Sequence, residues 1–297
     1  MQKTEKLGIA VSITSLIFIL ELAGGFFTNS VALLGDAFHM LTDVLALLLS
    51  ISALLLARKK PDLRRTFGLH RVEIFAALVN GITVFMLAVF LLVESYRRLF
   101  HTENVRSLEM MLVAIAGLVA NAVSLKILGH TDDLNVRSAA LHILGDMLSS
   151  VVVVTGGFLM FFTGAMIIDP LLSIGISIVI MYSAFQILRE SSGILMERAP
   201  KHLDVKKLVE EIRNQYGIVD VHDIRVWSIC SNVHAMSAHL VVPDMKVSET
   251  KEIIKKVNVY LEKYGILITT FQIECENCGK GMVCEIAHCG SKEIGEH

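Results

Sequence analysis

The chain has 297 residues, of which 54% are hydrophobic and 19% charged, and its formal net charge is −2. Its mean hydropathy of +0.61 and its low charge content favour a membrane protein over a soluble globular domain. No basic patch with interleaved aromatic residues is present, so we expect no nucleic-acid partner. The sequence also lacks His-Glu-x-x-His and other hydrolytic patterns, so we expect no enzymatic activity.

Six apolar stretches of about 20 residues or more follow one another along residues 1–190. Each is long enough to cross a hydrocarbon core of about 30 Å as a helix. We therefore predict a polytopic α-helical membrane protein with six transmembrane helices that contact lipid. The predicted spans are approximately residues 7–27, 31–57, 72–93, 108–128, 139–162 and 167–188.

The loop charges predict an orientation. Residues 57–71 contain six lysines and arginines against a single acid, Asp62, so this loop is expected in the cytoplasm. An even number of spans then places both termini in the cytoplasm. We expect the segment 94–106, which carries three arginines, to be a loop on the opposite side. No cleavable signal or organellar pattern is evident, which favours a prokaryotic plasma membrane.

A polar linker, residues 191–201, leads to an expected α+β cytoplasmic domain over residues 202–274. We predict helices at 204–215 and 247–263 and strands at 219–230, 233–242 and 267–274. Asp204 and Ser248 are the expected N-caps of the two helices. The order αββαβ suggests a three-stranded sheet covered by two helices, which resembles part of a ferredoxin-like fold.

Two His-x-x-x-Asp pairs stand inside predicted spans. His39 and Asp43 lie in the second span, and His142 and Asp146 lie in the fifth. The spacing places each pair on one helix face, and ionisable residues in the hydrocarbon usually face a partner or a cavity. If the two faces meet, four nitrogen and oxygen ligands suit tetrahedral Zn²⁺, although Cd²⁺, Co²⁺ and Ni²⁺ also fit. The alternative is that these groups hydrogen-bond between helices, which explains two identical pairs less well.

Other polar residues of the spans are more typical of helix packing or of a cavity wall. They are Asn29, Asp36, Asn80, Glu94 and Asn121. Asp36 lies two helical turns before Asp43 and is a candidate for the entry path. Glu21 is the one charged residue of the first span.

Further histidines and cysteines are candidate cytoplasmic ligands. His222, His234 and His239 lie on or beside the two paired strands, and His70 lies in the basic loop. The C-terminal segment 275–297 is rich in cysteine and has soft-metal spacing; its candidates are Cys275, Cys278, Cys284, His288 and Cys289. The alternative is a disordered tail with reactive thiols, and we expect no disulfides in a reducing cytoplasm.

Several stretches resemble the cation diffusion facilitator family, in the order that the family has them. They are SVALLGDAFHMLTDVLALLLS (30–50), FGLHRVEIFAALVNG (67–81), SAALHILGDMLSSVVVV (138–154), DPLLSIGISI (169–178) and VHDIRVWSI (221–229). The two His-Asp pairs are similar to those of the zinc-transporting branch. The resemblance implies a homodimer, proton-coupled export of Zn²⁺ from the cytoplasm, and a tail domain that binds metal and helps dimerisation.

The resemblance also bears on the cytoplasmic candidates. His70 and His239 occupy positions similar to metal ligands of some members, and His222 is expected to join His239. The last strand, ILITTFQIE, lacks the histidine that members often have before Gln-Ile-Glu. We expect Cys275 and Cys278 to replace that ligand, as a terminal Cys-x-x-Cys does in some vesicular zinc transporters.

The ligand types explain why protons would drive transport. A metal-bound histidine is neutral and a metal-bound aspartate is ionised, so metal binding releases protons and acid weakens it. A site that opens inward at higher pH loads Zn²⁺, and a site that opens outward at lower pH releases it. The alternative from another class is a membrane metal sensor without transport, but paired sites within the spans favour transport.

Overall fold

The computed structural model describes residues 3–57, 61–101, 103–128, 134–215, 217–231, 233–275 and 282. For residues 3–11, 43, 46–57, 128, 134–142 and 215 the description is limited to the backbone. The chain divides into two compact units, Met1–Leu54 with Ala76–Arg189, and Leu55–Phe75 with Glu190–His297.

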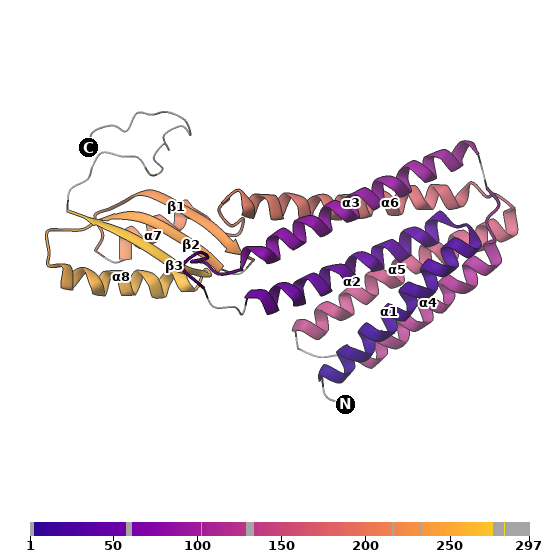
Figure 1. Cartoon of the computed structure of the whole chain (residues 1–297), viewed down its shortest axis with the longest axis horizontal. Helices are drawn as coiled ribbons and strands as arrows, with labels where there is room; N and C mark the ends of the chain where they lie inside the picture. The colour runs from indigo at the N-terminus through magenta and orange to yellow at the C-terminus, as the bar shows by residue number, and fades with distance from the viewer. Residues whose placement is uncertain are drawn as a thin grey trace. The chain divides into compact units, whose positions relative to one another are not determined.

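The first unit consists mainly of six long helices (Figure 1). They are α1 (Lys3–Thr28), α2 (Val31–Ala57), α3 (Arg71–Phe100), α4 (Ser107–Leu128), α5 (Leu134–Thr163) and α6 (Ile168–Leu195). Within the described residues, α3 to α6 are each long and apolar enough to cross a membrane. The apolar stretches described in α1 and α2 are Ser12–Thr28 and Val31–Thr42.

The outward faces of these helices are apolar. Phe90 and Val93 of α3, for example, are 60% and 62% exposed, and Leu148 of α5 is 70% exposed. A continuous apolar surface of this kind would cause aggregation in water, whereas lipid tails solvate it. The first unit is therefore membrane-embedded.

Glycines allow close contact where α4 packs against α1 and α5 (Figure 1). A Cβ at Gly24 of α1 would lie 2.8 Å from Cγ1 of Val113, and a Cβ at Gly157 of α5 would lie 3.1 Å from Cβ of Met111. In a membrane bundle, small residues stabilise such contacts because they let helix backbones approach each other.

The start of α2 is fixed by a buried carboxylate of α6. Asp169 accepts hydrogen bonds from the Ser30 hydroxyl (2.5 Å) and from the backbone N–H groups of Val31 (2.9 Å) and Ala32 (3.3 Å). The Ser30 hydroxyl in turn accepts the N–H of Leu33 at 3.1 Å. These bonds satisfy N–H groups that a helix start leaves without partners, and they join the first turns of α2 and α6.

The loop expected over residues 94–106 is wrong in its first part, because α3 continues to Phe100. Arg98 in the last turn of α3 donates hydrogen bonds to Glu94 one turn earlier (2.9 Å) and to the backbone oxygen (2.7 Å) and side-chain oxygen (2.9 Å) of Asn29. A basic residue also interacts favourably with the C-terminal end of a helix. These contacts extend the helix beyond the apolar stretch that the sequence marks.

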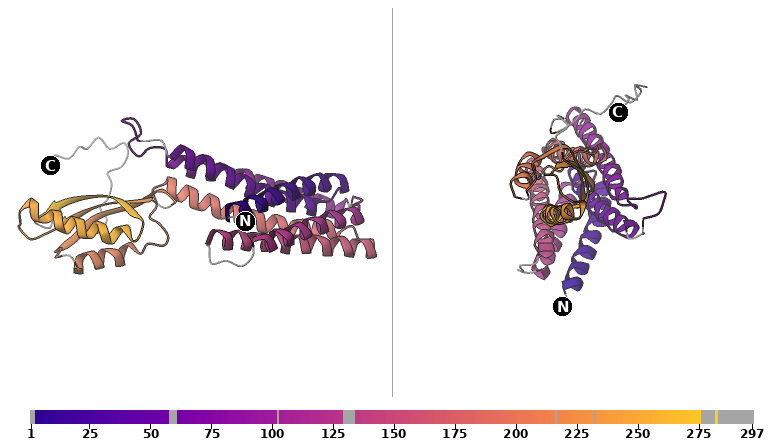
Figure 2. Two further views of the ribbon diagram at one scale, coloured as in Figure 1. Left: turned by 90° about the horizontal axis from the view of Figure 1, so that it is seen from below. Right: turned by 90° about the vertical axis from the view of Figure 1, so that its left-hand side faces the viewer.

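The second unit contains a three-stranded sheet and two helices (Figures 1 and 2). Its elements are α7 (Val205–Gln215), β1 (Asp220–Cys230), β2 (Val233–Val241), α8 (Val247–Glu262) and β3 (Ile266–Glu274). The strand order is β1-β2-β3, with β1 antiparallel to β2 and β2 parallel to β3. This is the order of helices and strands expected from the sequence.

One apolar core joins α7 and α8 to the same face of the sheet. Ile212 of α7 and Leu261 of α8 pack in it with Ile224 of β1 and Leu240 of β2. Because alternate residues of a strand point to opposite faces, the neighbours of these core residues lie on the face without helices. His239 is one of them.

The two helix starts of this unit differ in how far the sequence predicted them. Asp204 caps α7 as expected, since its carboxylate accepts the N–H of Lys207 at 3.1 Å. α8 begins at Val247, as expected, but the expected cap Ser248 is wrong, because Lys246 is the N-cap. Glu249 accepts the N–H of Lys246 at 3.2 Å and so stabilises this start from inside the first turn.

Candidate metal centre

Asp36 connects α2 to α5. Its side chain is 3% exposed. The Ser149 hydroxyl of α5 donates a hydrogen bond to Oδ1 of Asp36, and the Ser150 hydroxyl lies 3.5 Å from Oδ2. We therefore assign Asp36 to helix packing, in place of the entry-path role considered for it from the sequence. Its contacts also fix which residues of the two helices are level.

The register that follows places the two His-Asp pairs at the same depth along the two helices. The two helices run antiparallel (Figure 1), so equal steps forward along α2 and backward along α5 stay level. Three steps from the Asp36–Ser149 contact place His39 level with Asp146. Seven steps place Asp43 level with His142. Each histidine is thus level with an aspartate of the other helix.

Two of these four residues have described side chains. Asp146 is 3% exposed, and His39 is partly buried. Asp36 interacts electrostatically with both of them. For Asp43 and His142 the structure gives the helix positions alone. The interior of the bundle therefore holds two acidic groups and an imidazole that interact electrostatically, an arrangement that attracts a cation.

The remaining polar residues of the helices lie elsewhere or play other parts. Asn29 and Glu94 belong to the Arg98 cluster at the end of α3. Asn80 of α3 and Asn121 of α4 are buried, 5% and 1% exposed. The structure joins none of these four to His39 or Asp146 by a described hydrogen bond.

A second cluster lies in the three-stranded sheet. His222 of β1 pairs directly with His239 of β2, and Glu274 ends the neighbouring strand β3. The Glu274 carboxylate lies 3.2 Å from Nε2 of His222 and 2.8 Å from Nδ1 of His239. One potential ligand atom from each of the three residues lies within 4.8 Å of those of the other two. Two imidazoles and one carboxylate are a common ligand set for Zn²⁺.

Asp223 completes the surroundings of His239. Its carboxylate lies 3.7 Å from Nε2 of His239, on the side of the ring opposite Glu274. The backbone of Asp223 has φ of +44° and interrupts the regular pairing between His222 and Arg225. Such a bulge re-aims side chains. A carboxylate on the second nitrogen of a histidine orients the ring and leaves the first nitrogen for a metal.

The structure does not bring every expected ligand to this cluster. His234 lies with Ser228, whose hydroxyl is 3.0 Å from its Nδ1, and with the ring of His202. Burial, and to a smaller extent the neighbouring His202, lower the pKa of His234 below its ordinary value. His70 is half-buried in the loop before α3. Neither belongs to the one group of three or more ligand-type residues found in the described part of the chain.

The cysteine candidates are described only at their start. Cys275 follows Glu274 directly and carries a free, exposed thiol, so it is adjacent in sequence to the cluster. Cys278, Cys284, His288 and Cys289 lie outside the described residues. Glu274 itself was not predicted, because the sequence does not show that β3 lies beside β2.

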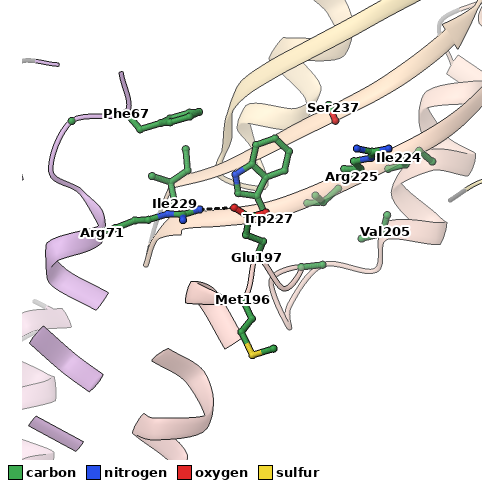
Figure 3. Close-up of a pocket in the computed structure, with 13 residues that line it drawn as sticks. Phe67, Arg71, Met196, Glu197, Val205, Ile224, Arg225, Trp227, Ile229 and Ser237 are labelled. Carbon is green, nitrogen blue, oxygen red and sulfur yellow. Dashed lines mark hydrogen bonds and ion pairs between the residues drawn. The ribbon is translucent and has the colours of Figure 1, made fainter. Parts of the chain in front are cut away.

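The second unit also has a pocket of about 990 Å³, which is of a different kind (Figure 3). Trp227 and Arg225 of β1 line it together with Phe67. Arg71 and Glu197, also in its wall, form an ion pair at 3.1 Å. The lining contains no histidine or cysteine, so the pocket is not a further metal centre of the type described above.

Comparison with protein families identifies the chain. The family model "Cation efflux transmembrane domain" matches residues 7–196, and "Cation efflux protein, cytoplasmic domain" matches residues 200–276. The chain belongs to the cation efflux family. Its members are transporters and not enzymes, as expected from the sequence. The resemblance to cation diffusion facilitators is thereby confirmed.

Bacterial members of the cation efflux family are similar over most of their length. The "Cadmium, cobalt and zinc/H(+)-K(+) antiporter" of Bacillus subtilis is 38% identical over 274 residues, 90% of this chain and 88% of the relative. The "Zinc transporter ZitB" of Yersinia pestis is 35% identical over 282 residues, 93% and 89% of the two chains. The "Metal cation efflux system protein CzcD" of Cupriavidus metallidurans is 34% identical over 275 residues, 92% and 87%.

The regions matched by the cation efflux models include both groups of residues. The transmembrane model includes the α2 and α5 positions of the His-Asp pairs. The cytoplasmic model includes His222, His239 and Glu274 and ends at residue 276. Cys275 therefore lies inside the matched region, and the later cysteines lie beyond it.

Proposed function

We propose that this chain is a secondary transporter that exports Zn²⁺ from the cytoplasm in exchange for protons. Relatives named as a cadmium, cobalt and zinc/H(+)-K(+) antiporter and as zinc transporters support this substrate class and this driving ion. Cd²⁺ and Co²⁺, which the first name includes, are the alternative cargo, and Ni²⁺ suits the same ligands.

The proposed transport site consists of His39, Asp43, His142 and Asp146. The observation that carries it is the register between α2 and α5, which follows from the Asp36–Ser149 hydrogen bond. Two residues of opposite type are level at two successive turns, so a cation between the helices would meet two imidazoles and two carboxylates. The two aspartates balance the charge of the dication, which lowers its cost inside the membrane. Imidazoles disfavour Mg²⁺ and Ca²⁺, which prefer oxygen.

The same ligands couple transport to protons. Zn²⁺ needs neutral imidazole and ionised carboxylate, so it competes with protons for all four residues. Facing the cytoplasm at higher pH, the site loads the metal. Facing a more acidic exterior, the histidines take up protons and the metal leaves. Alternation between the two openings then exports Zn²⁺ and imports protons.

For the topology we propose that α1 to α6 are six transmembrane helices with both termini in the cytoplasm. The basic loop after α2 supports a cytoplasmic position for that loop. Bacterial relatives support a bacterial plasma membrane. The sheet and its two helices then form a cytoplasmic domain related to part of the ferredoxin-like fold. The family model of this domain is named for dimer formation, which supports a homodimer.

We propose that the cytoplasmic cluster of His222, His239 and Glu274 holds a structural or regulatory Zn²⁺. Asp223 would orient His239 through its Nε2 atom, and Cys275 is the candidate for a further ligand because it follows Glu274 directly. A metal bound here would hold β1, β2 and β3 together at one end of the sheet. Cys278 remains a candidate ligand from the sequence.

Zinc flux into liposomes that contain the purified protein tests the transport site. We expect flux with the wild type and none with Asp43→Ala or His142→Ala, whereas Asp62→Ala in the exposed loop serves as a control that keeps it. Flux that survives both substitutions would reject the site. Zinc binding without any flux in the wild type would favour the sensor alternative, and faster flux of Cd²⁺ or Co²⁺ would change the assigned cargo.

A further inference from the structure

Glu21 of α1 is a buried acid that is not among the four proposed ligands of the transport site. Its side chain is 0% exposed, and neither carboxylate oxygen has a hydrogen-bond partner among the residues that the structure describes. An ionised carboxylate that is removed from water without a partner is very costly. Such a group needs either a cation or a proton close to it.

Close helix contacts place Glu21 at the depth of the transport site. A Cβ at Gly25 of α1 would lie 3.1 Å from the backbone nitrogen of Leu34 in α2. Four steps back along α1 and four forward along α2 bring Glu21 level with the residue before His39. On the other side, a Cβ at Gly117 of α4 would collide with Oε1 of Glu21. The carboxylate thus occupies space that only a glycine leaves open.

The charges that surround Glu21 belong to the same acidic group. Glu21 interacts electrostatically with Asp36 of α2 and with Asp146 of α5, and α2 also contributes His39 to this region. The titratable residues of α4 are Glu109 and Lys126, near its two ends. Carboxylates that interact in this way repel when no cation lies between them, so one that holds a proton relieves the repulsion.

We propose that Glu21 is a proton-exchanging residue of the transport cycle, which holds a proton while the metal site is empty and releases it when Zn²⁺ binds. This inference rests on the proposed function. When Zn²⁺ enters, the carboxylic O–H bond breaks, the proton leaves to the solvent and the remaining carboxylate adds one negative charge near the dication. When Zn²⁺ leaves on the other side, a proton from that side restores the O–H bond. No other reactant is needed.

The test counts the protons released for each Zn²⁺ bound. Full-length protein in detergent is titrated with Zn²⁺ by calorimetry, in buffers whose enthalpies of protonation differ. Glu21→Gln keeps the size of the side chain but has no proton to exchange. We expect it to bind Zn²⁺ with the same stoichiometry and to release about one proton fewer per ion at the transport site. Zinc bound at the cytoplasmic cluster contributes equally to both proteins.

A second variant displaces the Glu21 side chain without replacing any titratable residue. Gly117→Ala forces the Glu21 carboxylate from its place, and we expect fewer protons to be released than in wild type. Gly175→Ala of α6 is the matched control, because a Cβ there meets nothing within 4 Å, and it should match wild type. Unchanged proton release in Glu21→Gln and Gly117→Ala, with Zn²⁺ bound, would overturn the inference. A wild type that binds no more Zn²⁺ than Asp146→Ala would overturn the proposed function instead.

Discussion

At the scale of single residues, Asp146 is the more deeply buried of the two proposed transport-site residues whose side chains the structure describes. It is 3% exposed and level with His39. Asp146→Asn keeps the shape but removes the negative charge that the dication needs. We expect a loss of zinc flux of at least about 100-fold in liposomes, because replacing one metal ligand by an amide lowers the binding free energy of Zn²⁺ by several kcal/mol. Asp62→Asn, in the exposed loop, is the control. Near-normal flux in Asp146→Asn would exclude this aspartate as a ligand.

Asp223 provides a test of the cytoplasmic cluster. Its carboxylate faces the His239 nitrogen that points away from Glu274. We expect Asp223→Asn to weaken zinc binding at this cluster by about 10–100-fold, which is the usual effect of removing a residue that orients a metal-bound histidine. His239→Ala should abolish that binding event altogether. Equilibrium dialysis against Zn²⁺ measures both, and equal affinity in wild type and Asp223→Asn would contradict the assigned role.

His234 predicts a pH dependence of stability. Its pKa is lowered in the folded chain, first by burial and then by His202. As pH falls through the ordinary histidine value of about 6.5, the unfolded chain takes up a proton and the folded chain does not. Stability is therefore unaffected by His234 above this pH and decreases below it, until the lowered folded-state pKa is reached.

The variant His234→Gln should consequently lose less stability than wild type between about pH 7.5 and pH 5.5. Urea unfolding in the presence of a chelator measures this, with the fluorescence of Trp227, the only tryptophan of the chain, as the probe. His202→Gln should shrink the loss by a smaller amount because burial remains. A pH dependence that is identical in His234→Gln and wild type would show that His234 titrates alike in both states.

At the scale of elements, the first turn of α2 depends on Asp169 of α6. This buried carboxylate accepts three hydrogen bonds from the start of α2. Asp169→Ala leaves the buried N–H groups without a partner, and we expect a loss of about 1–3 kcal/mol. Thermal unfolding in detergent measures it. Asp204→Ala, at the exposed start of α7, is the matched control with an expected loss of about 1 kcal/mol; equal small losses would argue against the Asp169 cap.

The helices and strands were largely predictable because their apolar patterns are strong. The spans read from hydropathy became helices, and the αββαβ order followed from alternation in short segments. The helix ends were less predictable than the helices themselves. Arg98 extends α3 through its bonds to Asn29, which is distant in sequence, so no local pattern contains this contact. At the start of α8 the partners are local, but Glu249 bonds to Lys246, which is not one of the usual capping residues.

The candidate sites, too, were predictable where they depend on a local sequence pattern and not where they depend on contacts in the folded chain. The repeated His-x-x-x-Asp spacing identified the membrane pairs, since both members of a pair share one helix. Glu274 could be found only once β3 was known to lie parallel to β2, next to His239. His234 was grouped with the wrong histidines because its position near the start of β2 separates it from His239, near the end of that strand.

At the scale of the whole molecule, the proposed metal site inside the membrane is coupled to a proton gradient across it. Competition between Zn²⁺ and protons for the same histidines and aspartates makes the gradient the energy source. Family membership makes transport the expected activity, but the coupling is specific to the ligands proposed here. The driving force for export, rather than metal binding, is therefore the property that a test must measure.

The most direct measurement is zinc uptake by inverted membrane vesicles that contain the full chain, with and without an acidic interior. We predict uptake only when the interior is more acidic than the outside, and a collapse of uptake when a protonophore is added. Vesicles with Asp43→Ala give the background. Uptake that is equal before and after the protonophore, and above that background, would contradict proton-driven export.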